Sequence, residues 1–174
     1  MGDSPLPEGM STATESLPDA PERLFFRVAV RPGMNNPQAR KQANDWIAAN
    51  VKLPDDDAVA WGIPTAPGDP LRSYWLRGAA IVDSHDLQAV DAEAGANGAP
   101  PILKLSFNAE GSESLKQATA NWRGGRLAMV LDGAVLATPI VADEIDSGQL
   151  GLSMGPGAAL ENAQALAAAL MAGR

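Results

Sequence analysis

Side chains that could do acid–base or nucleophilic chemistry are few in this chain. His85 is its only histidine, and Ser84 and Asp86 flank it directly. A nucleophilic triad needs a serine, a histidine and a carboxylate that meet in space, whereas adjacent residues on a helix point in different directions. We therefore interpret His85 as a solvated residue at the start of a helix, and we expect no catalytic residue and no enzymatic activity.

Two acidic segments could do chemistry: the first could hold a metal ion, and the second, with its paired carboxylates, could do acid–base work. The first, residues 55–57, is three contiguous aspartates, but a calcium-binding hand loop needs ligands at alternating positions, a central glycine and a terminal glutamate. The second contains Asp143, Glu144 and Asp146, for which the sequence predicts no cleft. The chain has no cysteine, which excludes disulfides, thiolate zinc sites and a cysteine nucleophile. We interpret both segments as solvated loops and predict no metal and no cofactor.

Binding of anions or nucleic acids has little support. Gly155-Pro156-Gly157 precedes a predicted helix, whose N-terminus could attract an anion, but the lysine of a phosphate-binding loop is missing. A flexible entry to the helix explains these residues as well. The net charge is −8, and contacts to nucleic-acid phosphates need clustered cations. We predict no nucleic-acid partner.

Aromatic residues are the remaining candidates for a binding surface. Trp46 and Trp122 fall on apolar helix faces and fit a core. Trp61 is followed by a glycine, and the pair Tyr74-Trp75 lies beyond a proline-rich loop. Neighbours in a strand point to opposite faces, so at least one residue of this pair can reach the surface. Core packing and polypeptide binding are both open for Trp61, Tyr74 and Trp75.

The apolar periodicity indicates the elements that position these side chains. For the first half, the expected elements are a strand at 24–30, a helix from Pro37 that ends before Pro54, a short strand at 58–61, one bent strand or two at 73–82, and a short helix at 85–93. For the second half, they are a strand at 102–107, a helix capped by Asn108, a hairpin around Asp132-Gly133, a strand at 148–154, and a helix from Leu160 to Gly173.

These elements predict an α+β fold, with a mostly antiparallel sheet that helices cover on one face. Asp-Gly between two apolar runs is a strong hairpin signal, because the turn needs positive φ at its centre. The order strand, helix and hairpin predicts a ferredoxin-like βαββ core in the C-terminal half.

Composition divides the chain near residue 22. Residues 1–21 hold four prolines and four acidic residues, with no Lys or Arg. Such a segment buries too little apolar surface to order itself, so we expect a disordered acidic tail or linker at 1–21 and a single domain at 22–174. No apolar run reaches the roughly 18 residues of a membrane helix, and no signal peptide is visible.

The motifs of the second half resemble a known family. They are residues 107–111 (FNAEG), residues 125–133 (GRLAMVLDG), Pro139-Ile140, and the Leu/Ala helix that ends at Gly173. Together they resemble the head of the first periplasmic domain of SecD, which alone or fused as SecDF is a membrane protein that assists Sec-dependent export. The resemblance is best over about residues 77–174.

The resemblance implies a non-enzymatic module of protein transport that engages unfolded or exported polypeptide. It implies the membrane part of SecD and SecF and the Sec translocon as partners, and a periplasmic or other extracytoplasmic location. We expect a cytoplasmic location if the chain is complete as given. The alternative function is a free-standing scaffold or ligand-binding protein that reuses the same fold, because fold does not determine function.

Overall fold

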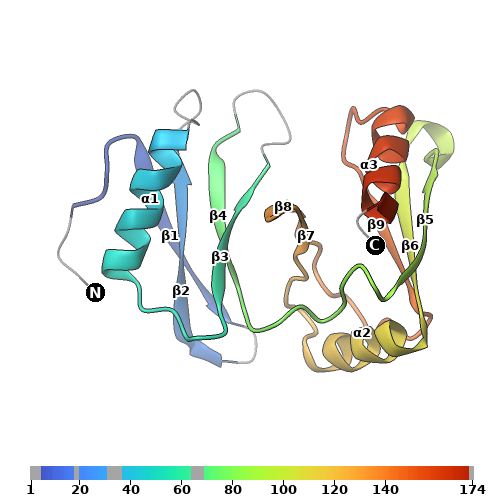
Figure 1. Cartoon of the computed structure of the whole chain (residues 1–174), viewed down its shortest axis with the longest axis horizontal. Helices are drawn as coiled ribbons and strands as arrows, with labels where there is room; N and C mark the ends of the chain where they lie inside the picture. The colour runs from blue at the N-terminus through green and yellow to red at the C-terminus, as the bar shows by residue number, and fades with distance from the viewer. Residues whose placement is uncertain (1–4, 18–19, 31–36, 64–68, 173–174) are drawn as a thin grey trace. The chain divides into compact units, whose positions relative to one another are not determined.

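The computed structural model of the chain describes residues 5–17, 20–30, 37–63 and 69–172. Its residues group into two compact units. We call Met1–Ala79 together with Leu127–Thr138 unit 1, and Ala80–Arg126 together with Pro139–Arg174 unit 2. The chain therefore leaves unit 1, returns to it with a hairpin, and ends in unit 2 (Figure 1). The single domain predicted over residues 22–174 stays a prediction, and it would span both units.

Unit 1 is a six-stranded sheet with a helix against it (Figure 1). Its strands lie in the order β1-β2-β4-β3-β8-β7, and every neighbouring pair is antiparallel except β3 and β8. Its elements in chain order are β1 (Met10–Leu17), β2 (Ala20–Val30), α1 (Pro37–Asn50), β3 (Ala58–Gly62), β4 (Leu71–Leu76), β7 (Met129–Leu131) and β8 (Ala134–Ala137).

Helix α1 builds the core of unit 1. Its apolar residues at helical spacing, Ala39, Ala43 and Ile47, are buried, and Leu71 of β4 packs against Ala39. Half-buried apolar side chains, including Trp61 of β3, pack around both clusters. The apolar stripe that the sequence predicts for this helix is therefore the one that contacts the sheet.

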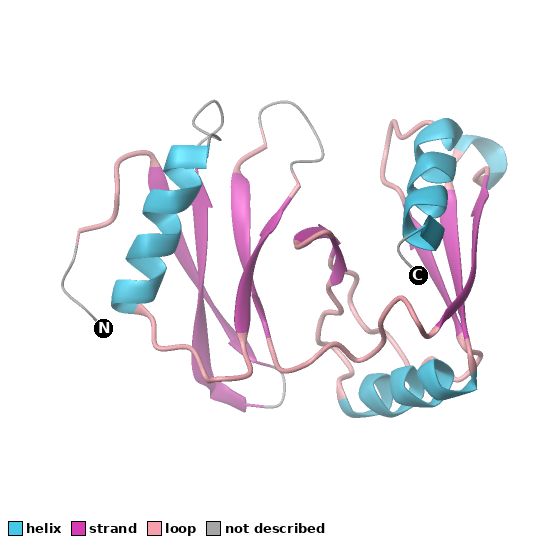
Figure 2. Ribbon diagram, viewed as in Figure 1, coloured by secondary structure: helices cyan, strands magenta, loops and turns pink. Residues whose placement is uncertain are grey.

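Unit 2 is a three-stranded antiparallel sheet in the order β5-β6-β9, with α3 against β5 and β6 and α2 against β6 (Figure 2). Buried Leu103, Leu105, Leu152, Ala163 and Ala167 form much of its interior. Its elements in chain order are β5 (Leu87–Glu93), the 3-10 turn η1 (Ala96–Gly98), β6 (Ile102–Phe107), α2 (Ala109–Asn121), β9 (Gln149–Ser153) and α3 (Leu160–Ala172).

The hairpin β7-β8 turns at the predicted dipeptide. Asp132 has φ +49° and Gly133 has φ +77°, the pair of positive values that a tight hairpin turn requires. At its base, the N–H of Gly124 donates to the carbonyl of Val141 (2.9 Å), and the N–H of Val141 donates to the carbonyl of Gly125 (2.8 Å). The base of the hairpin thus belongs to unit 2, while β7 and β8 extend the sheet of unit 1.

The predicted α+β class with mostly antiparallel sheets is confirmed. The predicted order of strand, helix and hairpin is present as β6, α2 and β7-β8, although its strands are shared between two sheets. Asn108 caps α2 as predicted, because its side-chain oxygen accepts a hydrogen bond from the N–H of Gly111 (2.8 Å).

The helix expected at 85–93 is wrong, because this segment is strand β5. It pairs with β6 from Leu87 to Glu93, and Leu87 is buried. The short polar turn before it is closed by Asp83, whose carboxylate accepts from the N–H of His85 (2.7 Å). Pairing with a neighbouring strand has overridden the local helical preference of this Ala- and Glu-containing segment.

Part of the tail expected at residues 1–21 is also strand. Met10–Leu17 forms β1, which pairs with β2 over its whole length. Composition underestimates such a segment, because main-chain pairing with an adjacent apolar strand supplies hydrogen bonds that do not depend on side-chain hydrophobicity. The bent strand expected at 73–82 is confirmed only as far as Leu76, where β4 ends.

Candidate functional site

Trp61, the first of the predicted binding residues, lies between β3 and α1. Its indole Nε1 donates a hydrogen bond to Oδ1 of Asn44 on α1 (2.9 Å). The ring packs against the buried cluster of Ala39 and Leu71. Its main observed contacts are therefore internal, and they fix the helix on the sheet.

Trp75 lies on the same sheet face as Trp61. In the β3–β4 register Val59 is opposite Trp75, and cross-strand neighbours share a face. The Trp75 Nε1 donates to Oδ2 of Asp57 (2.7 Å), and the other oxygen of that carboxylate accepts from the N–H of Gly78 (2.9 Å). Asp57 thus holds β4 and the turn that follows it.

Tyr74 lies on the opposite face of the sheet, across from Ala60. Its ring packs on the backbone of Gly62, where an added Cβ would lie 2.6 Å from Cε2 of the tyrosine. Tyr74 is half-buried, as are Trp61 and Trp75. The structure therefore brings the two tryptophans to the face that α1 covers and places the tyrosine on the other.

The remaining sequence candidates for chemistry stay apart. His85 is exposed in the turn before β5. Among the residues that the structure describes, no three His, Asp or Glu side chains are grouped so that they could hold a metal ion. Gly155 and Gly157 both have positive φ (+86° and +80°) in the turn that leads to α3, as a helix entry of tight turns requires.

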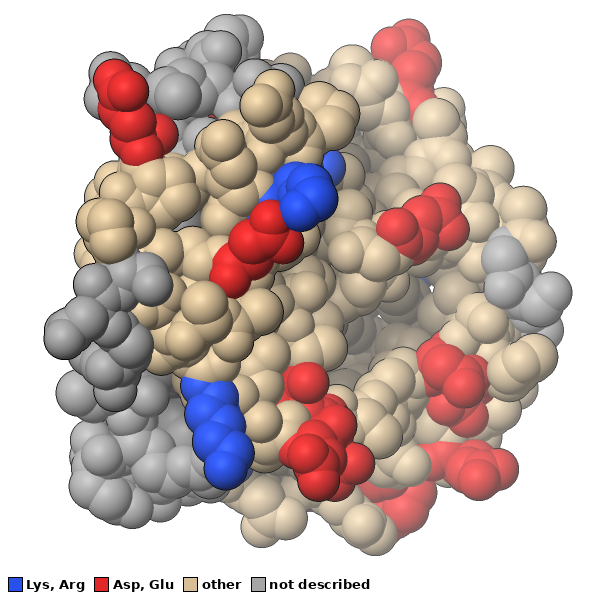
Figure 3. Space-filling model, turned by 60° about the vertical axis from the view of Figure 1, so that its left-hand side comes forward, with Lys and Arg blue, Asp and Glu red and all other residues tan. Residues whose placement is uncertain are grey.

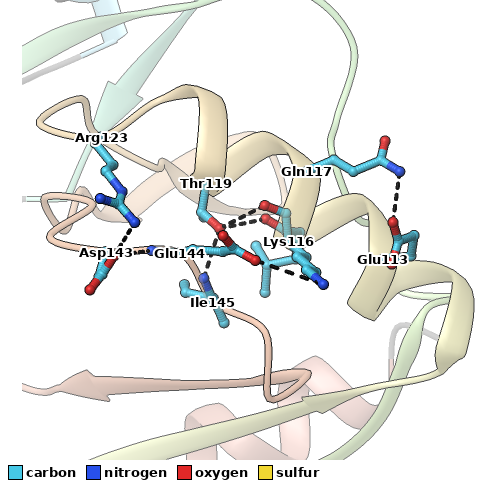
Figure 4. Close-up of polar contacts among 9 residues, drawn as sticks. Glu113, Lys116, Gln117, Thr119, Arg123, Asp143, Glu144 and Ile145 are labelled. Carbon is cyan, nitrogen blue, oxygen red and sulfur yellow. Dashed lines mark hydrogen bonds and ion pairs between the residues drawn. The ribbon is translucent and has the colours of Figure 1, made fainter.

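A polar cluster on α2, which the sequence analysis missed, fixes the loop before β9 (Figure 4). Thr119 is fully buried; its Oγ1 accepts from the N–H of Ile145 (2.9 Å) and lies 2.8 Å from the carbonyl of Leu115, to which it donates. Two exposed ion pairs flank it, Lys116 with Glu144 and Arg123 with Asp143. Two of the acidic residues considered above for acid–base work therefore have cationic partners.

On the face that Figure 3 shows, most described side chains are uncharged, with acidic groups and fewer basic groups dispersed among them. Several large apolar side chains of the described residues are exposed to solvent. They are Ile63, Ile81, Ile102, Val130 and Ile140. Within the described residues, no helix is both long and apolar enough to cross a membrane.

Residues 63–174 match the family model described as the SecDF P1 head subdomain. The chain belongs to this family. The match contains every element from β4 onwards, and so includes Tyr74 and Trp75, whereas Trp61 precedes it. The resemblance inferred from the motifs of the second half is thus confirmed.

Two curated relatives of this P1 head chain carry translocase names. It is 31% identical over 120 residues to "Protein translocase subunit SecD" of Acidaminococcus fermentans, a match that covers 67% of this chain and 27% of the relative. It is 29% identical over 110 residues to "Protein translocase subunit SecDF" of Brucella abortus, covering 59% and 14%. The chain thus spans about a quarter of the first relative's length, and less of the second.

A solved structure described as "Structure and function of a membrane component SecDF that enhances protein export" is also similar to this chain. The match has 30% identity and a TM-score of 0.48, and it covers 54% of this chain and 41% of the other.

Proposed function

We propose that this chain is the extracytoplasmic head module of a SecD- or SecDF-type protein and assists Sec-dependent protein translocation by engaging unfolded polypeptide. The observation that carries the proposal is the match of residues 63–174 to the SecDF P1 head subdomain. The names of the relatives, which are translocase subunits, agree with it. Its partners are then the membrane part of SecD and SecF, the Sec translocon and the exported polypeptide.

The role proposed is one of binding rather than catalysis. The large apolar side chains that are exposed on the described residues fit weak contacts with the apolar segments of an unfolded chain. Two of the acidic side chains that were candidates for metal binding or acid–base chemistry, those of Asp57 and Asp143, instead hold a turn and a loop. Energy for transport then comes from other parts of the assembly.

Trp61, Tyr74 and Trp75 remain our proposed contact residues for polypeptide. A substitution of either tryptophan would also remove a structural hydrogen bond, because the indole N–H groups of Trp61 and Trp75 donate to Asn44 and Asp57. The ring of Tyr74 packs on the sheet face away from α1. Truncation of Tyr74 therefore separates an effect on binding from an effect on folding better than truncation of either tryptophan does. Trp75→Phe keeps an aromatic ring but removes the donor to Asp57.

Fluorescence anisotropy of a labelled, unfolded secretory polypeptide tests this surface. We expect micromolar binding to the wild-type chain, several-fold weaker binding to Tyr74→Ala and Trp75→Ala, and intermediate binding to Trp75→Phe, since each aromatic contact contributes roughly 1 kcal/mol. Trp122→Phe, at the C-cap of α2, is the matched control and is expected to bind as wild type does. Equal affinity in all variants would exclude Tyr74 and Trp75 as contact residues.

A further inference from the structure

Four strands form the edges of the two sheets. β1 and β7 end the sheet of unit 1, and β5 and β9 end the sheet of unit 2. An edge strand presents N–H and C=O groups that can pair with another extended chain. Proteins protect such edges with short strands, charged side chains, prolines or bulges, so an edge without any of these devices is informative.

Three of the four edges carry protection. β7 is three residues long and has a register shift after Met129. β5 has a register shift after Leu87 and carries Asp91 and Glu93. β1 has a register shift near its end, between Ser16 and Leu17. β9, with the sequence QLGLS, has five residues in regular register, and it contains neither a charged residue nor a proline.

Two hydrogen bonds establish which side of β9 faces its neighbour. The N–H of Phe107 donates to the carbonyl of Gly148 (3.0 Å), and the N–H of Met154 donates to the carbonyl of Pro101 (2.9 Å). The β6–β9 register between these points is regular. In an antiparallel pair, bonded and non-bonded positions alternate. Because Gly148 and Met154 are bonded to β6, every second residue between them, Leu150 and Leu152, also turns its main-chain groups towards β6.

The other residues of β9, namely Gln149, Gly151 and Ser153, turn their main-chain groups away from β6. The main-chain groups of Gln149 already have a partner: the hydroxyl of Ser147 donates to its carbonyl (3.4 Å) and accepts from its N–H (3.3 Å). Gly151 and Ser153 are exposed, and no described strand pairs with this side of β9. They offer alternating donors and acceptors at the spacing of an extended backbone.

The sheet face beside these groups is shaped for a small side chain. A Cβ added to Gly151 would meet only Cγ2 of Ile102, at 3.8 Å, so there is open space above the glycine. Ile102 itself is 36% exposed. In an added strand, the residue opposite Gly151 points to this same face and can pack against Ile102.

We infer that β9 is a docking edge at which an extended, uncharged segment of unfolded polypeptide adds as a fourth strand to the sheet of unit 2. The inference rests on the proposed function and specifies β9 as the strand at which the polypeptide binds. Main-chain hydrogen bonds to Gly151 and Ser153 supply sequence-independent affinity, as a module that handles many polypeptides requires. The space beside Ile102 favours small apolar side chains at alternate positions.

Amide hydrogen exchange of the full chain, with and without a short peptide of alternating valine and threonine, tests this edge. We expect exchange at Gly151 and Ser153 to slow when peptide binds, while Leu150 and Leu152, already bonded to β6, change little. A peptide with the same side chains, but N-methylated at alternate positions so that its bonding edge is blocked, should give no protection. Protection at β1 instead, or equal effects of both peptides, would overturn the inference.

Substitution of Gly151 gives an independent test. Gly151→Pro removes the outward N–H without removing a bond to β6, and we expect about tenfold weaker peptide binding, as for a lost hydrogen bond with an orphaned partner. Gly151→Ala keeps the N–H and should bind within about twofold of wild type. Thermal melting monitors the fold; if Gly151→Pro unfolds, Ser153→Lys, which places a charge on the edge, takes its place. Undiminished binding by a folded variant overturns the inference.

Three further outcomes are distinct. Binding of unfolded polypeptide without any protection at β9 overturns the docking edge and leaves the proposed function standing. Absence of any binding of unfolded polypeptide overturns both. Protection of Gly151 that rises with protein concentration in the absence of peptide would assign the edge to a second copy of this chain, and would also overturn the inference.

Discussion

At the scale of single residues, Asp57 gives the acidic segment 55–57 a structural role. Asp55 and Asp56 are exposed, whereas the Asp57 carboxylate accepts from the Trp75 indole and from the N–H of Gly78. Both bonds are made to one ionised group, and such bonds are stronger than neutral ones. One residue of the run therefore closes the end of β4, and the others remain in solvent.

Asp57→Ala should lower the free energy of unfolding by about 1 to 2 kcal/mol, because it removes two charge-assisted hydrogen bonds at a half-buried site. Urea unfolding followed by tryptophan fluorescence measures the change. Asp56→Ala is the matched control and should stay within about 0.5 kcal/mol of wild type. Equal stability of the two variants would show that the Asp57 contacts contribute nothing.

The sequence predicts residue types well where local geometry decides. Asn108 as a cap and Asp132-Gly133 as a turn were both recognisable, because each satisfies a requirement of its own backbone. The internal bond of Trp61 to Asn44 was not recognisable, since it joins residues of different elements. Whether an aromatic residue is packed or presented depends on such partners.

At the scale of elements, Thr119 joins α2 to the loop that leads into β9. A threonine on the apolar face of a helix is the one signal of this contact in the sequence, because a buried hydroxyl needs a partner. Its hydroxyl both satisfies the N–H of Ile145 and bonds back to its own helix. A single buried side chain thus links α2 to the loop before β9.

Thr119→Val removes the hydroxyl at nearly constant volume and leaves the N–H of Ile145 without its acceptor. We expect a loss of about 1 to 3 kcal/mol in stability and faster amide exchange at Ile145. Thr119→Ser keeps the hydroxyl and should preserve the slow exchange of Ile145, even though it loses a buried methyl group. Slow exchange in both variants would contradict the role assigned to the hydroxyl.

Elements with strong internal patterns were predicted, and those defined by pairing were not. Helices α1, α2 and α3 follow from their apolar stripes, and α2 also from its Asn108 cap. The cap predicted at Gly173 lies outside the residues that the structure describes. β1 and β5 were missed, because neither has a regular apolar alternation and both gain their hydrogen bonds from an adjacent strand. The assignment of β8 beside β3 depends on a long-range parallel contact that no local pattern indicates.

At the scale of the whole molecule, the chain combines two small sheets, each with its own helices and buried side chains. The match to the SecDF P1 head subdomain begins at residue 63, so it includes part of unit 1 and all of unit 2. The motifs that revealed this family in the sequence, the Asp-Gly hairpin and the α3 helix, lie within the matched region. The function proposed here depends on the exposed surfaces of such sheets rather than on a reactive group.

The central claim is that this chain recognises the unfolded state of a polypeptide. The most direct test measures its affinity for one disulfide-bonded secretory polypeptide in two forms, reduced and unfolded or oxidised and folded. We predict micromolar binding of the unfolded form and at least roughly tenfold weaker binding of the folded one, since only the unfolded form exposes main-chain groups and apolar segments together. Equal affinity for both forms, or binding of neither, would contradict the account.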